Sequence, residues 1–405
     1  MKKICFITQC VLPIPTVKGG AVETLVEYIL DENEKRPKYQ FTVISISDSD
    51  AQKKSLKYKY TNFKYVEGAN KQLNAFLYNV QRVVQHIGLY TPYSMEFMRL
   101  IKIIKELPEQ DLYIYEAGPT TQIPLLAKVI PQNKFLVHIH WDGMGTKIKD
   151  KCFLKLLPVS NYIGDQWKNS TGCDKSKIIP LYNCAKIERF VKKSSEDEKK
   201  QLRDKLNIPI LNKVIIYTGR IVPEKGIKEL LKAFESIEKD NVTLLIIGSA
   251  NFGSATNTPY EKEVAELIKH STKSIVFTGF VHQTELYKYY NIADVAVMPS
   301  MFEDPAPLVC IETQATGTPL IATRVGGISE YADKTGVLLI ERDENLELNL
   351  TREIERLLDD SDLCAKMGEA NQKNALKYNT EGYFNRFVKI IDEIMGKTVP
   401  DENVK

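Results

Sequence analysis

Short apolar runs alternate with amphipathic stretches along the first half of the chain. Four of these runs predict buried strands, at residues 3–8, 41–47, 112–115 and 134–139. Apolar residues at helical spacing predict helices at residues 20–30, 73–87, 94–106 and 121–128. Strands that alternate with helices form a parallel sheet whose two faces are both covered.

The same alternation starts again after Asn183. Strands are predicted at residues 213–217, 242–247, 274–278, 294–298 and 319–322, and helices at residues 226–237, 260–270, 283–291, 308–316 and 351–378. The charged stretch 192–204 predicts the start of another helix, and a last helix at 380–396 has an aromatic face. The predicted fold class is α/β, with two doubly wound Rossmann-like domains facing each other across a cleft.

Length and composition agree with this organisation. A chain of 405 residues is too long for one compact core, so we expect domains at residues 1–186 and 187–378, a helix at 379–396 and a disordered tail at 397–405. Hydrophobic content of 43% and charged content of 26% are typical of a globular protein in water. The seven cysteines include no Cys-x-x-Cys pair, which argues against a disulfide framework or a structural zinc site and favours a reducing compartment.

The N-terminal segment and the length of the apolar runs indicate the cellular location. The apolar run at the N-terminus stops at Thr8-Gln9, too early for a secretory signal, and no later run approaches the roughly 18 residues of a spanning helix. The predicted location is therefore the cytoplasm.

Charge is distributed unevenly between the two halves. Residues 1–190 hold 27 Lys and Arg against 18 Asp and Glu, a net charge of +9, whereas the remainder has a net charge of −6. Basic clusters mixed with aromatic residues suit an anionic membrane surface, so contact with the inner face of a membrane is one expectation. For Lys53 to Lys64, loops that keep the protein soluble are the favoured interpretation, and the apolar face at 73–87 would ordinarily pack on its own domain. Nothing in the pattern indicates a nucleic-acid partner.

An acidic loop precedes the helix predicted at 308–316. Glu303 and Asp304 are followed by prolines at 305 and 307, and Glu312 lies about one turn into the helix. The first backbone N–H groups of a helix are unpaired and carry partial positive charge, so the amides of Leu308 and Val309 after Pro307 suit a diphosphate. Carboxylates only accept hydrogen bonds, so they suit sugar hydroxyls. An exposed acidic loop before an ordinary helix is the alternative.

A second phosphate-type pattern follows the strand at 213–217. Gly219-Arg220 ends this strand, and Lys225 lies five residues further on, before a helix. A guanidinium binds phosphate oxygens through two parallel hydrogen bonds, and a lysine adds a mobile point charge. We therefore expect Gly219, Arg220 and Lys225 to contribute to an anion site.

These motifs occur in the order seen in family 4 glycosyltransferases, which the chain resembles over nearly its whole length. The resemblance is carried by Gly19-Gly20, the segment 180–190, Gly219-Arg220 with Glu224-Lys225-Gly226, the acidic loop with Glu312, Gly317-Thr-Pro319 and Gly326-Gly327. It implies a retaining enzyme of GT-B fold. It also implies that residues 1–186 bind the acceptor, that residues 187–378 bind the nucleotide sugar, and that the last helix crosses back to the first domain.

Two departures from the family pattern limit the transfer of residue roles. The family separates its two glutamates by seven residues, so the position in register with the first is Asp304 rather than Glu303. Prolines replace the usual glycine-rich loop and remove two N–H donors. Both Glu303 and Asp304 therefore remain candidates for contact with the sugar, and Glu312 is assigned to the ribose.

The first domain is expected to supply the acceptor side of the site. Gly19 and Gly20 follow the first strand and allow backbone to approach a ligand. Period-two spacing puts His138 and His140 on one face; the family resemblance favours His140 beside the reacting sugar, with His138 as a packed neighbour. A metal is the alternative use of two histidines, but the sequence offers only the local Asp142 as a third ligand. Asp48-Ser-Asp50 resembles a metal motif but is interpreted as a solvated turn.

The predicted activity is transfer of a sugar to a hydroxyl of a glycan or lipid-linked acceptor in the cell envelope. The family resemblance favours a UDP-sugar as the donor and implies that no metal or other cofactor takes part. The catalytic set is His140, Arg220, Lys225, Asp304 and Glu303. The alternatives are a sugar-nucleotide epimerase or phosphorylase, or a glycan- or lipid-binding protein that keeps a vestigial nucleotide site. A glycosidase needs no phosphate clamp, and a nicotinamide dehydrogenase would need Gly-x-Gly-x-x-Gly after the first strand.

Overall fold

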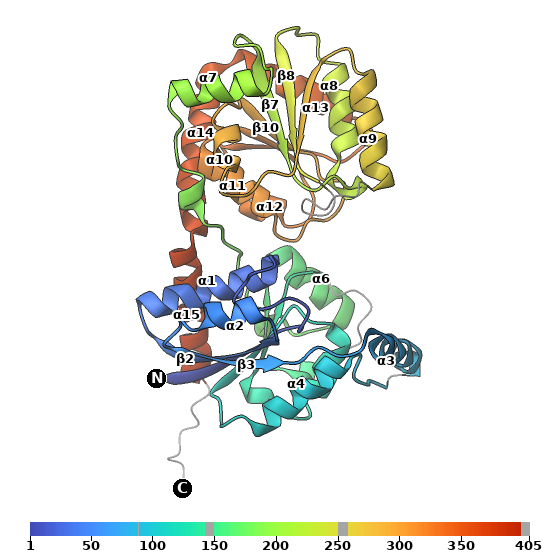
Figure 1. The fold of residues 1–405 in the computed structure, drawn as a ribbon, viewed down its shortest axis with the longest axis vertical. Helices are drawn as coiled ribbons and strands as arrows, with labels where there is room; N and C mark the ends of the chain where they lie inside the picture. Colours follow the sequence, from blue (N-terminus) through green and yellow to red (C-terminus); the bar gives the residue numbers. More distant parts are fainter. Residues whose placement is uncertain (88, 142–149, 250–257, 398–405) are drawn as a thin grey trace. The chain divides into compact units, whose positions relative to one another are not determined.

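A computed structural model describes residues 1–87, 89–141, 150–249 and 258–397. The chain forms two compact units (Figure 1). The N-terminal unit comprises Met1–Asn183 and Thr380–Lys405, and the C-terminal unit comprises Cys184–Asn379. Each unit is built on one six-stranded sheet in which every described strand pair is parallel.

The sheet of the N-terminal unit has the strand order β3-β2-β1-β4-β5-β6. Its strands are β1 Lys2–Ile7, β2 Tyr39–Ile46, β3 Thr61–Val66, β4 Leu112–Glu116, β5 Phe135–Ile139 and β6 Lys155–Pro158. The helices are α1 Ala21–Lys35, α2 Ser49–Ser55, α3 Lys71–Val84, α4 Met95–Glu106, α5 Ile123–Leu126, α6 Asn161–Thr171 and α15 Thr380–Lys397. The sequence pattern missed β3, because its exposed positions Asn62 and Lys64 interrupt the apolar run.

Helix α15 completes the core of the N-terminal unit although it comes last in the chain. The Phe387 ring lies 5.9 Å from Phe6 and 6.3 Å from Phe41, so it covers β1 and β2. The hydroxyl of Tyr39 donates a 2.7 Å hydrogen bond to Asp392. The aromatic face that the sequence predicted for this helix is therefore the face that packs on the sheet.

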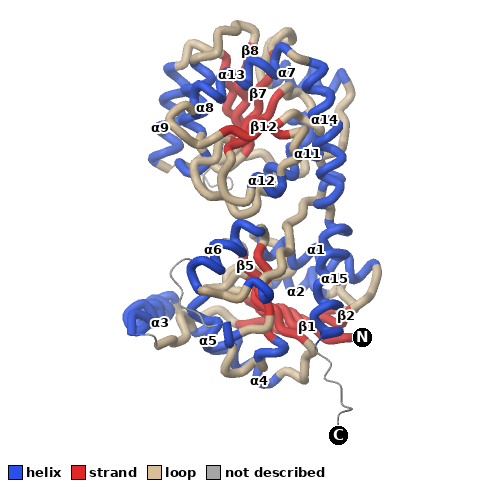
Figure 2. Tube along the Cα trace, turned by 180° about the vertical axis from the view of Figure 1, so that it is seen from behind, coloured by secondary structure: helices blue, strands red, loops and turns tan. Residues whose placement is uncertain are grey.

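The sheet of the C-terminal unit has the strand order β12-β11-β10-β7-β8-β9. Its strands are β7 Lys213–Thr218, β8 Val242–Ile247, β9 Ser274–Gly279, β10 Val295–Met298, β11 Leu320–Thr323 and β12 Val337–Ile340. The helices are α7 Glu196–Lys205, α8 Ile227–Glu235, α9 Pro259–His270, α10 Leu286–Tyr290, α11 Leu308–Thr316, α12 Ile328–Tyr331, α13 Leu346–Asp359 and α14 Ser361–Ala375. Figure 2 shows this sheet from behind, with helices on both faces.

The prediction of one continuous helix at 351–378 is wrong. The chain forms α13 and α14, and the break falls at Asp360, whose carboxylate caps α14 by accepting a 2.8 Å hydrogen bond from the Leu363 amide. Apolar residues continue at helical spacing on both sides of this cap, so periodicity alone did not reveal it. Leu350, Ile354 and Leu357 of α13 pack into the same core as Leu230 of α8.

Both strand orders reverse direction once. In the N-terminal unit the reversal lies between β1 and β4, and in the C-terminal unit between β7 and β10. In doubly wound sheets, ligands bind beyond the carboxyl ends of the strands at such a reversal. Among the helices of the described residues, none is both long enough and apolar enough to cross a bilayer.

Candidate functional site

Two loops of the C-terminal unit leave the sheet side by side at its reversal point. Strands β7 and β10 are paired, with Ile216 opposite Ala296. Gly219-Arg220 follows β7, and the segment starting at Pro299 follows β10. Parallel pairing brings both segments to the same edge, where the anion-binding residues were predicted.

Backbone contacts join these two loops. The Met301 amide donates a 2.9 Å hydrogen bond to the carbonyl of Glu224. Gly226 has a φ of +71°, and a Cβ atom there would collide with the carbonyl of Pro299. Glycine at this position therefore permits a close approach that any side chain would prevent.

Lys225 and Asp304 meet where the two loops join. The Lys225 ammonium lies 2.5 Å from the Asp304 carboxylate and 4.7 Å from the centroid of the Phe302 ring. The Lys225 side chain is 20% exposed and that of Asp304 is 8% exposed. Because an ammonium has three donors, Lys225 retains donors for a second anionic partner.

Helix α11 begins directly after this loop and lacks an N-terminal cap. Pro307 occupies the cap position and makes no side-chain cap hydrogen bond. Within the described residues, the amides of Leu308 and Val309 have no hydrogen-bond acceptor, and the first inward bond is from Cys310 to the Pro307 carbonyl, at 3.1 Å. Unpaired amides at the positive end of a helix dipole form an anion site.

Glu303 has a different role from its neighbour Asp304. Its carboxylate accepts a 2.6 Å hydrogen bond from the Gly326 amide and forms a 2.7 Å ion pair with Arg342. A Cβ atom at Gly326 would collide with the backbone of the acidic loop, and the Gly327 amide donates a 2.8 Å bond to the Asp304 carbonyl. Glu303 therefore holds two loops together, whereas Asp304 faces the predicted phosphate-binding lysine.

Glu312 is buried and has an unusual protonation equilibrium. Burial raises the pKa of Glu312 to about 7, while hydrogen bonding to Gln283 and the charge of Arg189 oppose that rise. The Gln283 amide donates a 2.6 Å bond to Glu312 and accepts a 3.0 Å bond from Arg189. This carboxyl group can accept or donate a hydrogen bond near neutral pH, which suits a diol such as ribose.

Arg220 is exposed at the end of β7. Among the residues that the structure describes, no hydrogen-bond or ion-pair partner meets its guanidinium, whereas its carbonyl accepts a 2.9 Å bond from the Tyr217 hydroxyl. The carbonyl of Gly219 lies against Gly248, where a Cβ atom would have no room. The backbone of this turn is thus anchored while the Arg220 head group is available to an anion.

The reversal point of the N-terminal unit carries a second cluster. Gly19 and Gly20 have φ values of +82° and +104°, and a Cβ atom at Gly20 would collide with the Glu23 carboxylate, whereas Gly19 faces open space. The pKa of Glu23 is raised, first by burial and also by the charge of Glu116 at the end of β4. Glu23 at the start of α1 and Glu116 at the end of β4 therefore share one electrostatic environment.

Glu116 organises the two histidines. It lies opposite His138 in the β4–β5 register, accepts a 2.8 Å contact from His138 Nδ1 and lies 3.5 Å from His140 Nε2. The two imidazole rings are 4.3 Å apart, as period-two spacing predicted. Within the described part of the chain, Nε2 of each ring has no hydrogen-bond partner.

Electrostatics separate the roles of these groups. Burial lowers the pKa of His140 to about 4, and His138 lowers it further while Glu116 opposes the shift. Burial acts to raise the pKa of Glu116, but the two histidines outweigh it and hold that pKa at about 2. At neutral pH, His140 is therefore an uncharged imidazole beside an ionised carboxylate.

The structure brings to the two histidines a third candidate metal ligand that the sequence did not reveal. One ligand atom from each of Glu116, His138 and His140 lies within 4.8 Å of the others, a donor set that zinc accepts. Asp142, the local candidate, lies outside the described residues. Asp48 of the Asp-Ser-Asp segment caps α2 by accepting bonds from the amides of Asp50 and Ala51 and pairs with Lys18 at 2.7 Å, so it is a helix cap rather than a free turn.

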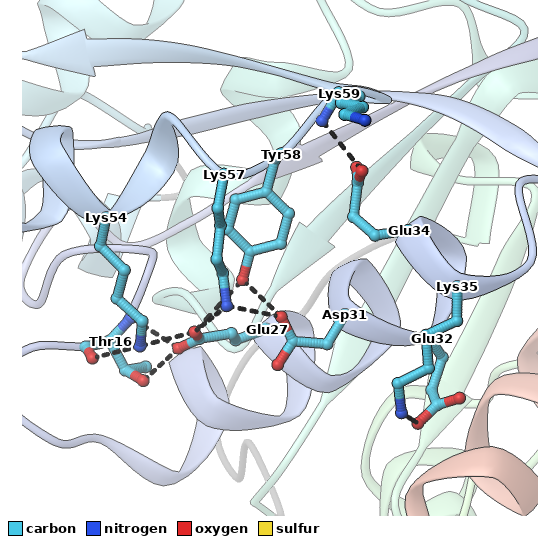
Figure 3. A network of polar contacts seen from close by, with 10 residues as sticks. All are labelled: Thr16, Glu27, Asp31, Glu32, Glu34, Lys35, Lys54, Lys57, Tyr58 and Lys59. Carbon is cyan, nitrogen blue, oxygen red and sulfur yellow. Dashed lines mark hydrogen bonds and ion pairs between the residues drawn. The ribbon is translucent and has the colours of Figure 1, made fainter.

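A buried carboxylate on α1 fixes the loop that carries Gly19 and Gly20 (Figure 3). Glu27 accepts a 2.8 Å hydrogen bond from the Thr16 amide and pairs with Lys54 at 2.6 Å. Burial alone would raise the pKa of Glu27, but the bonds from Lys54 and Thr16 outweigh it and lower the pKa. The network ties the β1–α1 loop to α2 and so limits its movement.

Several residues of these sites were not identified from the sequence. Glu116 ends an otherwise apolar strand, and an acid in that position is the signal that would have found it. Gln283, Arg342 and the position of Arg189 carry no local signal, because each acts through a partner remote in sequence.

Two six-stranded parallel sheets, each with polar groups at its reversal point, are the architecture of GT-B glycosyltransferases. Anabaena HepE in complex with UDP-glucose superposes on this chain with a TM-score of 0.70, at 17% identity, covering 97% of this chain and 100% of that one. The fold prediction is confirmed by this likeness.

The family follows from the sequence of the C-terminal unit. Residues 198–374 match the family of glycosyl transferases group 1 and belong to it. The lipopolysaccharide 1,2-N-acetylglucosaminetransferase of Salmonella typhimurium is 27% identical over 64% of this chain and 66% of its own length. The putative teichuronic acid biosynthesis glycosyltransferase TuaC of Bacillus subtilis is 32% identical over 46% of this chain. The chain spans less than two thirds of the length of both relatives, including 42% of TuaC.

Proposed function

We propose that this protein transfers a sugar from a UDP-sugar to a hydroxyl of a glycan or lipid-linked acceptor, with retention of the anomeric configuration. The observation that carries the proposal is the junction of the β7 and β10 loops. There the Lys225–Asp304 pair directly precedes the uncapped start of α11. The UDP-glucose complex of Anabaena HepE and the names of the bacterial relatives support the donor class and the envelope acceptor.

The donor diphosphate would be held by protein cations and dipoles. As the bond between the anomeric carbon and the β-phosphate oxygen breaks, negative charge develops on UDP. Arg220, Lys225 and the amides of Leu308 and Val309 would meet that charge, which would be electrostatic catalysis by a preorganised site. Glu312 would bind the ribose diol, and Asp304 a hydroxyl of the transferred sugar.

The acceptor chemistry would use the N-terminal cluster. A new bond forms between the acceptor oxygen and the anomeric carbon, and the acceptor proton leaves on UDP or with solvent. Neutral His140 can hold a hydroxyl without placing a positive charge beside the developing oxocarbenium ion. Gly19 and Gly20 would let backbone approach the same ligand.

Binding and turnover can be tested separately. Calorimetry with UDP should give a binding isotherm that Arg220→Ala weakens by about tenfold to a hundredfold, since a charge-assisted contact contributes roughly 1.5–3 kcal/mol. A panel of nucleotide sugars should show slow donor hydrolysis for the true donor. Binding without hydrolysis or transfer would indicate a vestigial nucleotide site. Epimerised donor, or phosphate-dependent turnover, would indicate one of the other reactions.

Adding a chelator tests the alternative in which Glu116, His138 and His140 bind a metal. In our mechanism 1,10-phenanthroline leaves donor hydrolysis unchanged, because no step uses a metal. A loss of rate that zinc restores would assign Glu116, His138 and His140 to a metal instead.

A further inference from the structure

Helix α3 leaves much of its apolar face exposed to solvent, although Leu77, Val80 and Val84 are half-buried. At 100° per residue, Leu73, Phe76, Leu77, Val80, Val83 and Val84 fall within an arc of about 120°. Phe76 is 63% exposed and Val83 is 70% exposed, and Ile87, one turn beyond, is 74% exposed. In Figures 1 and 2, α3 lies at the margin of the N-terminal unit.

Polar residues on one flank attach the helix to its unit. Asn74 donates a 2.7 Å bond to Glu96 and accepts a 2.9 Å bond from the Met95 amide. Gln81, two turns along, accepts a 2.7 Å bond from the Thr91 amide and is the buried residue of this helix. A surface helix normally buries its apolar side, so this arrangement is the reverse of the usual one.

The charge around the helix identifies the kind of partner. From Gly68 to Met95 the sequence contains no Asp or Glu, whereas Lys71 and Arg82 lie on the side of α3 opposite the apolar arc. The next acid is Glu96, and each of its carboxylate oxygens accepts a hydrogen bond, one from the Ala69 amide and one from the Asn74 side chain. A helix that carries cations and no acid attracts an anionic surface.

We propose that α3, continued by residues 85–87, docks the N-terminal unit on an anionic lipid bilayer, with Phe76, Val83 and Ile87 inserted at the interface. An amphipathic helix with an apolar face, cations on its polar face and low overall hydrophobicity lies in the plane of a membrane in this way. The inference does not depend on the proposed sugar transfer, because docking is measured without a nucleotide sugar.

Vesicle flotation with the full chain tests the proposal. The wild type should float with vesicles of phosphatidylcholine and phosphatidylglycerol, and bind at least tenfold less to phosphatidylcholine alone. Phe76→Gln with Val83→Gln should lower binding to the mixed vesicles by about tenfold or more, since each removes roughly one large apolar side chain from the interface. Raising the salt concentration should weaken binding.

A matched control is Leu211→Gln in the C-terminal unit. Leu211 is 80% exposed but belongs to no apolar helix face, so this variant should bind as the wild type does. Thermal unfolding at the wild-type temperature would show that the α3 variants are folded. The proposal is overturned if the wild type fails to float with anionic vesicles, or if the variant with Phe76→Gln and Val83→Gln binds them as well as Leu211→Gln does. It is also overturned if light scattering shows a dimer that the α3 substitutions dissociate, since the occupant would then be a second copy.

Discussion

Replacing Lys225 with alanine tests whether its ammonium group binds the donor diphosphate in addition to pairing with Asp304. The structure gives this side chain one anionic partner already, Asp304 at 2.5 Å, in a place where the two side chains are 20% and 8% exposed. If Lys225 also meets the leaving diphosphate, its loss should reduce kcat by about a hundredfold, because one preorganised donor contributes on the order of 3 kcal/mol. Loss of the pair should also lower the free energy of unfolding by about 1–3 kcal/mol, because Asp304 then stays largely buried without a counter-ion.

The double variant Lys225→Ala with Asp304→Asn distinguishes these two effects. It removes the unpaired charge, so most of the unfolding free energy should return, whereas the rate should stay low. Lys213→Ala is the matched control, because Lys213 forms a 3.0 Å pair with Asp294 at the opposite ends of the same two strands. Donor hydrolysis and denaturant unfolding are measured for all four proteins. Our reasoning is refuted if Lys225→Ala turns over at the wild-type rate, or if the double variant recovers the rate along with the stability.

Three further substitutions test separate parts of the sites. Because the pKa of Glu312 is about 7, UDP affinity measured by calorimetry should rise as pH increases from 6 to 8, and Glu312→Gln should remove that dependence; an equal slope in both proteins would contradict the ribose assignment. Glu116→Gln should lower kcat by about tenfold or more with little change in the donor KM, since His138 and His140 lose the anion that orients them; an unchanged kcat would make the cluster structural. Glu27→Gln should lower the free energy of unfolding at pH 7 by about 1–3 kcal/mol. The native-state pKa of Glu27 is lowered, so its contribution is present above the usual carboxyl pKa and is lost as pH falls through the native value. A difference between wild type and Glu27→Gln that persisted at low pH would refute this account.

The sequence predicted the elements whose burial is periodic. Strands β7 and β8 and helix α11 begin and end within about a residue of their predicted limits, because each buries a continuous or regularly spaced apolar set. Strand β12 was missed although its four residues are all apolar, because so short a run shows no periodicity. The break between α13 and α14 depends on one capping carboxylate and left the periodicity unchanged.

The roles of some predicted site residues could be inferred from the sequence, whereas the roles of others could not. Gly219, Lys225 and Pro307 belong to turns whose chemistry is local, so a pattern within a short segment was enough to identify each of them. The different roles of Glu303 and Asp304 depend on the Gly326 loop, which follows β11, and on Arg342, which follows β12. No pattern within the acidic loop could have made that distinction.

The two reversal points use opposite means to position charge, which explains why one was predicted better than the other. In the C-terminal unit, backbone amides and glycines form the site, and residues such as Gly219 and Pro307 make these turns recognisable in the sequence. In the N-terminal unit, Glu116 and His138 come from neighbouring strands, with 21 residues between them, and meet only through sheet register. A buried carboxylate is costly unless it has partners, and Glu116 meets the two imidazoles only in the folded sheet, so their pairing is not a property of any one segment. The pKa of about 4 that keeps His140 neutral follows from that burial, and it belongs to the site only after β4 and β5 have paired.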